Sequence, residues 1–191
     1  MDIVGKVSLM MADIEGERTI NYYLTLPISS RMLFYYYGIY WTIGSILMTA
    51  FLFPLGKVLL YSRFDLSQMS LIKMIPMYLT SNLFFGFFSL WLTSVLRGMS
   101  SLSALFLRVI NPIWMFGCYF YSWESLREFS PILAKICLIN PMVYIMEGMR
   151  SACLGSSGYL PYALSMTVLW SYIFVLAWHA NKKLKVKLDA V

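Results

Sequence analysis

The residues best suited to chemistry are a glutamate and an arginine three positions apart, Glu147 and Arg150. They follow Asn140-Pro141, a pair that opens a helix because asparagine caps the first turn and proline loses no hydrogen bond there. Two residues at this spacing share one face of a helix. The pattern predicts a local ion pair, and a role in gating or in contacting a substrate is the alternative.

Other reactive groups are sparse. The single histidine, His179, borders the basic end of the chain, which argues against a catalytic triad or a histidine-based metal site. Neither Gly5-Lys6 nor Gly56-Lys57 has the upstream glycine and following hydroxyl of a phosphate-binding loop. An intramembrane enzyme would need paired carboxylates or a histidine–aspartate cluster inside a span. We therefore expect no enzyme activity, no metal site and no directly bound cofactor.

Composition indicates a membrane protein. Of the 191 residues 60% are hydrophobic and only 13% are charged, less charge than a soluble domain of this size carries. The net charge of +6 does not indicate nucleic-acid binding, because four of the fifteen basic residues crowd into the last ten positions. The cysteines Cys118, Cys137 and Cys153 lack metal-ligand spacing, and a disulfide between the last two would require an oxidising compartment.

Four largely uncharged runs are long enough for a bilayer core of about 30 Å, which takes roughly 20 helical residues. They cover residues 32–56, 74–96, 104–123 and 159–180. Arg108, inside the third run, either snorkels to the interface or faces a substrate path, and Asn111-Pro112 should kink that helix. Four spans put both termini on one side, and the lysine-rich tail predicts that this side is the cytosol. The expected location is the inner or plasma membrane, in contact with lipid.

Two shorter helices are predicted between the third and fourth runs. Ser130-Pro131 and Asn140-Pro141 mark their starts, leaving about eight residues for the first and about a dozen for the second. Neither helix is long enough to cross a bilayer. Because both are largely apolar, we expect a re-entrant pair packed against protein that satisfies its broken backbone. A helix pair on the membrane surface that only covers loops is the alternative.

The first thirty residues carry too much charge to span a membrane. After the sequence EGER, apolar residues recur at helical spacing and predict a short amphipathic helix that ends at Pro27. The residues of this stripe are Thr19, Ile20, Tyr23, Leu24 and Leu26. Such a helix either lies on the membrane surface or docks on a cytosolic partner.

Two stretches resemble the ABC-2 type transporter permeases. EGERTINYYLTLPIS is similar to the cytosolic motif of that family, an acidic and basic cluster followed by threonine, a leucine-rich turn and proline-hydrophobic-serine. LAKICLINPMVYIMEGMR resembles the family signature before the last span, with a leucine, an Asn-Pro pair, a tyrosine, a glutamate and an arginine in register. The residues that match this signature are Leu138, Asn140, Pro141, Tyr144, Glu147 and Arg150. The resemblance covers nearly the whole chain.

The resemblance implies an all-α permease subunit of an ATP-driven exporter, with a transmembrane domain over residues 1–185 and a basic cytosolic tail over residues 186–191. Four spans, an N-terminal coupling helix and a re-entrant pair would form this domain. A separate ABC ATP-binding subunit would hold ATP and Mg, and a second permease copy would complete a homodimer or heterodimer. The exported substrate would be amphipathic, of the drug, lipid or polysaccharide class.

The resemblance also implies two groups of site residues. The group that contacts the ATPase comprises Glu15, Glu17, Arg18, Thr19, Tyr23, Leu24 and Pro27. The re-entrant group comprises Asn140, Pro141, Tyr144, Glu147 and Arg150.

The chain departs from the family pattern in two places. Family members commonly have six spans, two of them before the coupling helix, whereas this sequence starts almost on that helix. Arg18 also stands where glycine is common. The first departure leaves a second hypothesis open, a truncated or degenerate permease that is a structural membrane protein without transport activity.

Overall fold

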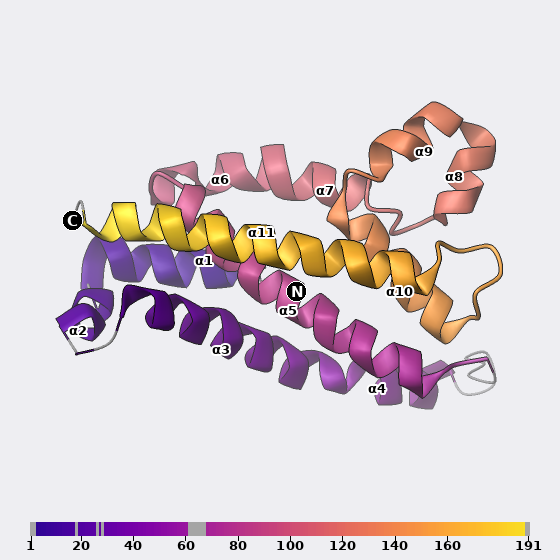
Figure 1. The fold of residues 1–191 in the computed structure, drawn as a ribbon, viewed down its shortest axis with the longest axis horizontal. Coiled ribbons are helices and arrows are strands. Elements are labelled where there is room, and N and C mark those ends of the chain that lie inside the picture. Colours follow the sequence, from indigo (N-terminus) through magenta and orange to yellow (C-terminus); the bar gives the residue numbers. More distant parts are fainter. Residues whose placement is uncertain (1–2, 18, 26, 28, 61–67, 190–191) are drawn as a thin grey trace. The chain divides into compact units, whose positions relative to one another are not determined.

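The computed structural model describes residues 3–17, 19–25, 27, 29–60 and 68–189, and its regular elements there are all helical (Figure 1). These elements are α1 (Ile3–Ala12), the π-helical η1 (Asp13–Glu17), α2 (Thr19–Thr25), α3 (Ser30–Ala50), α4 (Leu52–Leu60), α5 (Leu71–Val95), the 3-10 turn η3 (Met99–Ser101), α6 (Leu102–Leu105), the π-helical η4 (Phe106–Ile110), α7 (Asn111–Met115), α8 (Trp123–Phe129), α9 (Pro131–Cys137), α10 (Pro141–Cys153) and α11 (Tyr162–Asp189).

The helices belong to two compact units. The first unit contains Met1–Ser45, Asn82–Val109 and Ile173–Val191, and the second contains Ile46–Ser81 and Ile110–Tyr172. The long helices α3, α5 and α11 each contribute one part to each unit.

Three helices among the described residues are long and apolar enough to cross a membrane. They are Arg31–Leu59, Leu71–Val95 and Tyr162–Val186, and the bent pair α9–α10 would be a fourth span if it crosses as one element. The three overlap the predicted runs at residues 32–56, 74–96 and 159–180. The prediction of an all-helical chain with several apolar helices of membrane-spanning length is therefore confirmed.

The predicted span at residues 104–123 is too long. Helical turns run from α6 through η4 and α7 and end at Met115. At 1.5 Å per residue the run from Leu102 to Met115 measures about 21 Å, less than the bilayer core of about 30 Å. The π-helical stretch η4 ends directly before Asn111-Pro112, where the missing N–H of proline interrupts the α-helical ladder. Arg108 lies in this stretch with an exposed side chain.

The described part of the predicted basic tail is helical. Residues 186–189 continue α11, which begins after Pro161 and meets no glycine or proline further along. Lysines in the last turns of a helix also interact favourably with its C-terminal dipole. The last span and the basic end are therefore one continuous helix.

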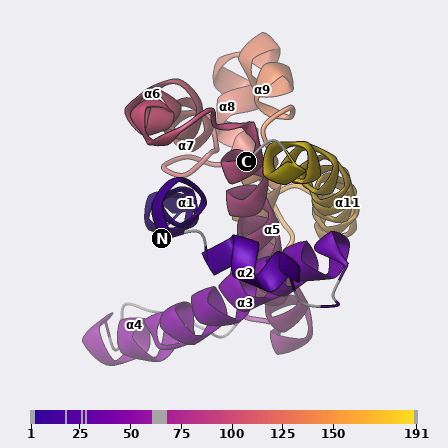
Figure 2. The ribbon, with the colours of Figure 1, turned by 90° about the vertical axis from the view of Figure 1, so that its left-hand side faces the viewer.

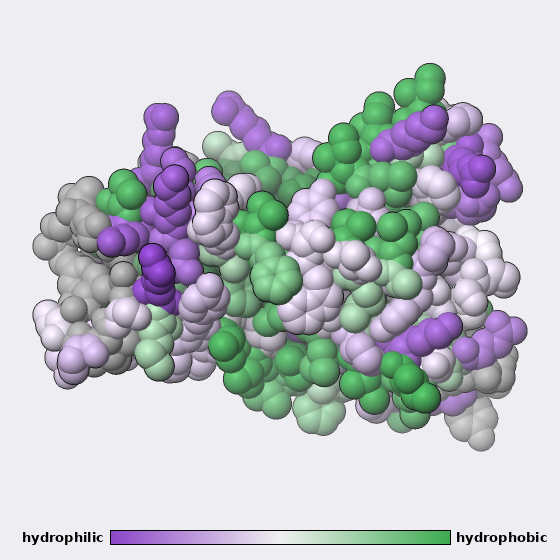
Figure 3. Space-filling view, viewed as in Figure 1, coloured by the Kyte–Doolittle hydropathy of each residue, from purple (hydrophilic) through white to green (hydrophobic). Residues whose placement is uncertain are grey.

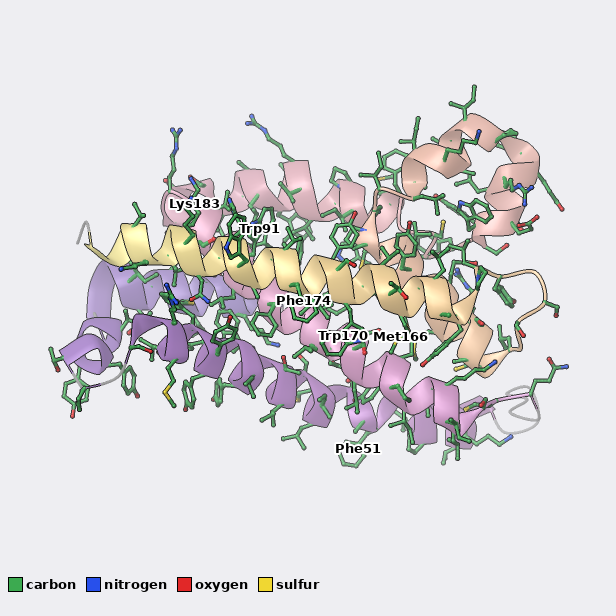
Figure 4. The ribbon with its side chains drawn as sticks, viewed as in Figure 1. Phe51, Trp91, Met166, Trp170, Phe174 and Lys183 are labelled. Carbon is green, nitrogen blue, oxygen red and sulfur yellow. The ribbon has the colours of Figure 1, made fainter. Side chains whose placement is uncertain are left out.

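The first candidate span contains an 18-residue apolar window that is almost wholly exposed. Only 6% of its apolar window is buried. Figure 3 shows the resulting apolar surface along the lower edge, over α3 and α4, and Figure 4 shows the Phe51 side chain pointing away from its helix. The large apolar side chains exposed on α4 and the adjoining end of α3 are Leu47, Met48, Phe51, Leu52, Leu55, Val58 and Leu59. Such a surface fits contact with lipid chains or with another apolar protein surface.

The helix α1 was not predicted from the sequence. Its buried residues are Ile3, Val7, Met10 and Met11. Lys6 connects it to α3, because its ammonium donates a hydrogen bond to the carbonyl oxygen of Trp41 at 2.9 Å and another to the hydroxyl of Ser45. Figure 2 shows α1 end-on. The buried face of this ten-residue helix follows from its packing in the first unit.

Small residues allow α3 and α5 to pack closely in the first unit. Gly38 faces the ring of Phe87, and a Cβ atom on Gly86 would lie 2.7 Å from the carbonyl oxygen of Gly38. Thr42 adds little bulk here, because its hydroxyl donates to the same carbonyl oxygen at 2.7 Å. Glycine and threonine permit this close approach of two backbones in apolar surroundings.

We expect Gly86→Ala to destabilise the protein, because the new methyl group would overlap the backbone of α3. Overpacking of this kind costs about 1–3 kcal/mol, which corresponds to roughly 5 °C in the temperature at which the detergent-solubilised chain loses its monodisperse peak. The control is Gly44→Ala, also on α3, where a Cβ atom meets nothing within 4 Å. This control should be neutral or slightly stabilising because alanine favours helix. If the two variants lost the monodisperse peak at the same temperature, this would contradict the close packing of α3 and α5.

Candidate functional site

The two predicted helix starts before the last span are confirmed. The Ser130 hydroxyl accepts from the N–H of Leu133 at 3.5 Å, and the side chain of Asn140 accepts from the N–H of Met142 at 3.0 Å. The helices that follow, α9 and α10, contain 7 and 13 residues. They are bent by 99° relative to each other, as the orange part of the ribbon shows (Figure 1). An additional short helix, α8, precedes them and was not predicted.

The break between α9 and α10, residues 138–140, is called the elbow below. Its backbone leaves the helical ladder, so its polar groups need other partners in an apolar environment. Two side-chain hydrogen bonds to elbow carbonyls meet this requirement, and a third, donated by the Asn140 side chain, ties the elbow to α7. They join the amide of Asn140 to the carbonyl of Ile113 (2.7 Å), the hydroxyl of Tyr144 to the carbonyl of Leu138 (2.8 Å) and the hydroxyl of Tyr172 to the carbonyl of Ile139 (2.6 Å). The elbow is thereby attached to α7 and α11.

Glu147 accepts hydrogen bonds from three chain segments of the second unit. Its side chain is 0% exposed, and its Oε1 atom accepts from Nη1 of Arg150 at 2.9 Å. The same oxygen accepts from the N–H of Trp123 at 3.2 Å, and Oε2 accepts from the N–H of Leu160 at 3.2 Å. The predicted ion pair is confirmed, and the carboxylate also joins α10 to the first residue of α8 and to the turn before α11.

Arg150 extends this network in another direction. Its Nη2 atom donates to the carbonyl oxygen of Tyr119 at 2.8 Å, in the loop between α7 and α8. A buried carboxylate is costly unless it is paired and hydrogen-bonded, and here each oxygen has at least one donor. We refer to Glu147 and Arg150 with these backbone partners as the Glu147 cluster.

The partners of the Glu147 cluster could not be identified from sequence. Trp123 and Leu160 donate through backbone N–H groups, and Tyr119 accepts through its carbonyl oxygen. Every non-proline residue carries these groups, so the residue type gives no signal. Ser122, the N-cap of α8, is the one sequence feature that marks the start of that helix.

The cysteines are free thiols, so no Cys137–Cys153 disulfide is present. Cys118 lies in the loop between α7 and α8, outside the candidate spans, with a positive φ of 55°. Burial, and then the neighbouring Cys137, raise the pKa of Cys118 to about 12. Burial thus favours the protonated thiol over the thiolate at this position.

The predicted coupling segment forms a short helix, as expected. In the first unit, the carboxylate of Asp13 accepts from the N–H of Ile20 at 3.0 Å and so caps the start of α2. Glu15 accepts from the N–H of Met99 at 3.1 Å, which ties the turn η1 to η3 beyond the end of α5. Tyr23 is 37% exposed. This small helix is therefore held at its start by carboxylates and presents an aromatic side chain outward.

Part of this segment lies outside the described residues, namely Arg18 and Leu26, together with the side chains of Glu17, Thr19 and Leu24. Pro27 is described and is exposed. The residues predicted to contact an ATPase belong to the first unit, and those of the predicted re-entrant group belong to the second. Each group forms its own local arrangement.

Comparison of the chain with protein-family profiles, curated proteins and solved structures finds no match. Among the described residues, no group of three or more histidine, cysteine, aspartate or glutamate side chains is placed to hold a metal ion.

We expect Glu147→Ala to destabilise the protein strongly, because it leaves the Arg150 guanidinium and two backbone N–H groups without their acceptor. Breaking a buried pair costs about 3–5 kcal/mol, or roughly 6–15 °C in thermal unfolding for a chain of this size. The measurement is the loss of the monodisperse peak on heating in detergent.

The matched control is Glu124→Ala, which removes the other i,i+3 pair in the second unit. The side chains of Arg127 and Glu124 are 57% and 41% exposed and lie 3.3 Å apart. An exposed pair contributes about 0.5 kcal/mol or less, so this variant should unfold close to the wild-type temperature. A similar fall in unfolding temperature in both variants would contradict a special structural role for Glu147.

Proposed function

We propose that this chain is the membrane-spanning permease subunit of an ATP-driven ABC exporter. The observation that carries the proposal is the bent pair α9–α10, joined to the last long apolar helix through the Glu147 cluster and the Tyr172 hydrogen bond. A broken helix pair can lie inside a membrane when side chains hydrogen-bond its free backbone groups. The pair also carries the sequence signature of the ABC-2 permeases, so motif and geometry support the same function.

The short helix α2 supports the part of the proposal that concerns ATP. It precedes the first candidate span, its tyrosines Tyr22 and Tyr23 are exposed, and their rings contact edge to face at 5.9 Å. Exposed aromatic side chains are favourable anchors at protein interfaces. We assign this surface to docking on a separate ABC ATP-binding subunit that holds ATP and Mg.

The proposed mechanism transmits motion of that subunit through α2. Glu15 links η1 to the N–H of Met99, and η3 follows α5 directly. A displacement of α2 when the ATPase closes would therefore act on the end of α5 as well as on the start of α3. ATP binding supplies the free energy, and transport requires that the permease contact the ATPase differently in two states.

The substrate path would lie between two permease copies, which form a homodimer or heterodimer. The exposed aromatic and methionine side chains of the spans suit an amphipathic cargo of the drug, lipid or polysaccharide class. The membrane would be the inner or plasma membrane, with both termini in the cytosol because the basic residues gather at the end of α11. The competing hypothesis is a structural membrane protein that occupies the bilayer without transporting.

The decisive experiment is co-purification in detergent of the full chain with its candidate ATPase, with and without residues 15–27. We expect a complex only when the segment is present, because α2 supplies the docking surface. Tyr23→Asp should weaken the complex and reduce stimulation of ATP hydrolysis by about tenfold, as expected for loss of an aromatic anchor of about 1.4 kcal/mol or more.

The control is Ser157→Asp, which adds the same charge to an exposed loop of the second unit. It should bind and stimulate the ATPase like the wild-type chain. Binding that persists without residues 15–27 would exclude α2 as the coupling helix. Failure of the intact chain to bind any ATPase would favour the structural membrane protein.

A further inference from the structure

Exposed basic side chains gather at one end of the first unit. Lys182, Lys183 and Lys185 are exposed on the last turns of α11. Arg97, just beyond the end of α5, and Arg31, near the start of α3, are also exposed. Two contacts place these helix ends together: Trp91 of α5 donates from Nε1 to Nδ1 of His179 at 2.8 Å, and Gly38 of α3 faces Phe87 of α5.

The basic end of α11 continues an apolar and aromatic stripe. Phe174, Trp178, Lys182 and Lys185 follow one another at spacings of four, four and three, so they lie on one face of the helix. Trp178 is 68% exposed, and the Lys182 ammonium lies 6.0 Å from the centre of its ring. Tryptophan followed by lysine one turn later is the sequence of groups found where a span passes from hydrocarbon to headgroups.

The orientation of this stripe is fixed by packing on other faces of α11. Ala180 and Leu184 are buried at 1% and 0% exposure, and His179 receives the Trp91 hydrogen bond. Figure 4 shows the Trp91 side chain against α11. Because the helix cannot rotate without losing these contacts, the lysines remain on the outer side of the unit.

Acidic side chains in the same unit do not cancel this charge. Asp13 and Glu15 are the carboxylates described in full there, and each accepts a backbone N–H, from Ile20 and Met99 respectively. Over the whole sequence of this unit, nine lysines and arginines stand against five aspartates and glutamates, so its formal charge is positive.

We propose that the stripe Phe174–Trp178–Lys182–Lys185, together with Lys183, is a binding surface for anionic phospholipid headgroups of the leaflet in which α11 ends. Charge complementarity identifies the occupant: the ammonium groups bind headgroup phosphate, and Trp178 sits at the level of the headgroups. Lysines next to a span are attracted to anionic lipid within a Debye length of the surface. The inference depends on membrane insertion and not on transport, so failure to bind an ATPase does not affect it.

The test is Trp178-dependent fluorescence quenching by brominated lipids. The full chain in mild detergent is titrated with brominated phosphatidylglycerol, which is anionic, or brominated phosphatidylcholine, which is zwitterionic. The signal of the W178F variant is subtracted, because the chain contains six tryptophans. We expect half-maximal quenching at roughly a hundredfold less phosphatidylglycerol, since each of the three lysines near an anionic surface contributes about fivefold in binding at low salt.

The variant K182Q/K183Q/K185Q should lose this preference while keeping the helix content and monodisperse peak of the wild type. The matched control K57Q/K73Q/K135Q removes the same charge from helices of the second unit. This control should retain the preference for phosphatidylglycerol. High salt should suppress the preference in the wild-type chain, because the lysines are exposed. Equal quenching by the two lipids, or equal loss in the two triple variants, would overturn the proposal.

Discussion

The buried carboxylate of Glu147 is the constraint on which the second unit depends. A fully buried charge is tolerated only when donors surround it, and these donors come from α10 itself, from the first residue of α8 and from the turn before α11. Satisfying one charge thus sets the positions of three chain segments. The Arg150 guanidinium adds the loop at Tyr119, so the neighbourhood of the last span is organised around a single acid.

The elbow illustrates the same requirement for the backbone. A break between two helices frees carbonyl groups that water would satisfy in a soluble protein, whereas a membrane provides no substitute. The hydroxyls of Tyr144 and Tyr172 donate to the carbonyls of Leu138 and Ile139, and the Asn140 amide ties the break to Ile113 of α7. The signature residues Asn140, Tyr144 and Glu147 therefore have a common physical role, because each hydrogen-bonds a backbone group at a helix end or in a loop.

The first unit depends on the close packing of apolar helices. Lipid chains are as apolar as leucine, so helices in a membrane gain little from hydrophobic burial and depend on tight contact and interhelical hydrogen bonds. Gly38, Thr42 and Gly86 allow the approach of α3 and α5, and Lys6 and the Trp91–His179 pair add polar contacts. These contacts also align the helix ends, which is why the exposed basic residues of three helices gather at one end.

The sequence by itself determined the helical class, the three long apolar helices and the two helix starts at Ser130-Pro131 and Asn140-Pro141, because hydrophobic length and capping chemistry are local properties. It also indicated the Glu147–Arg150 pair, which follows from helical spacing. Only the tertiary structure showed that α1 packs on α3 and that the 104–123 run ends at Met115. The same holds for the other partners of Glu147, which are backbone groups of Trp123 and Leu160. Backbone donors are the same in every non-proline residue, so only the folded chain reveals which of them meet a buried charge.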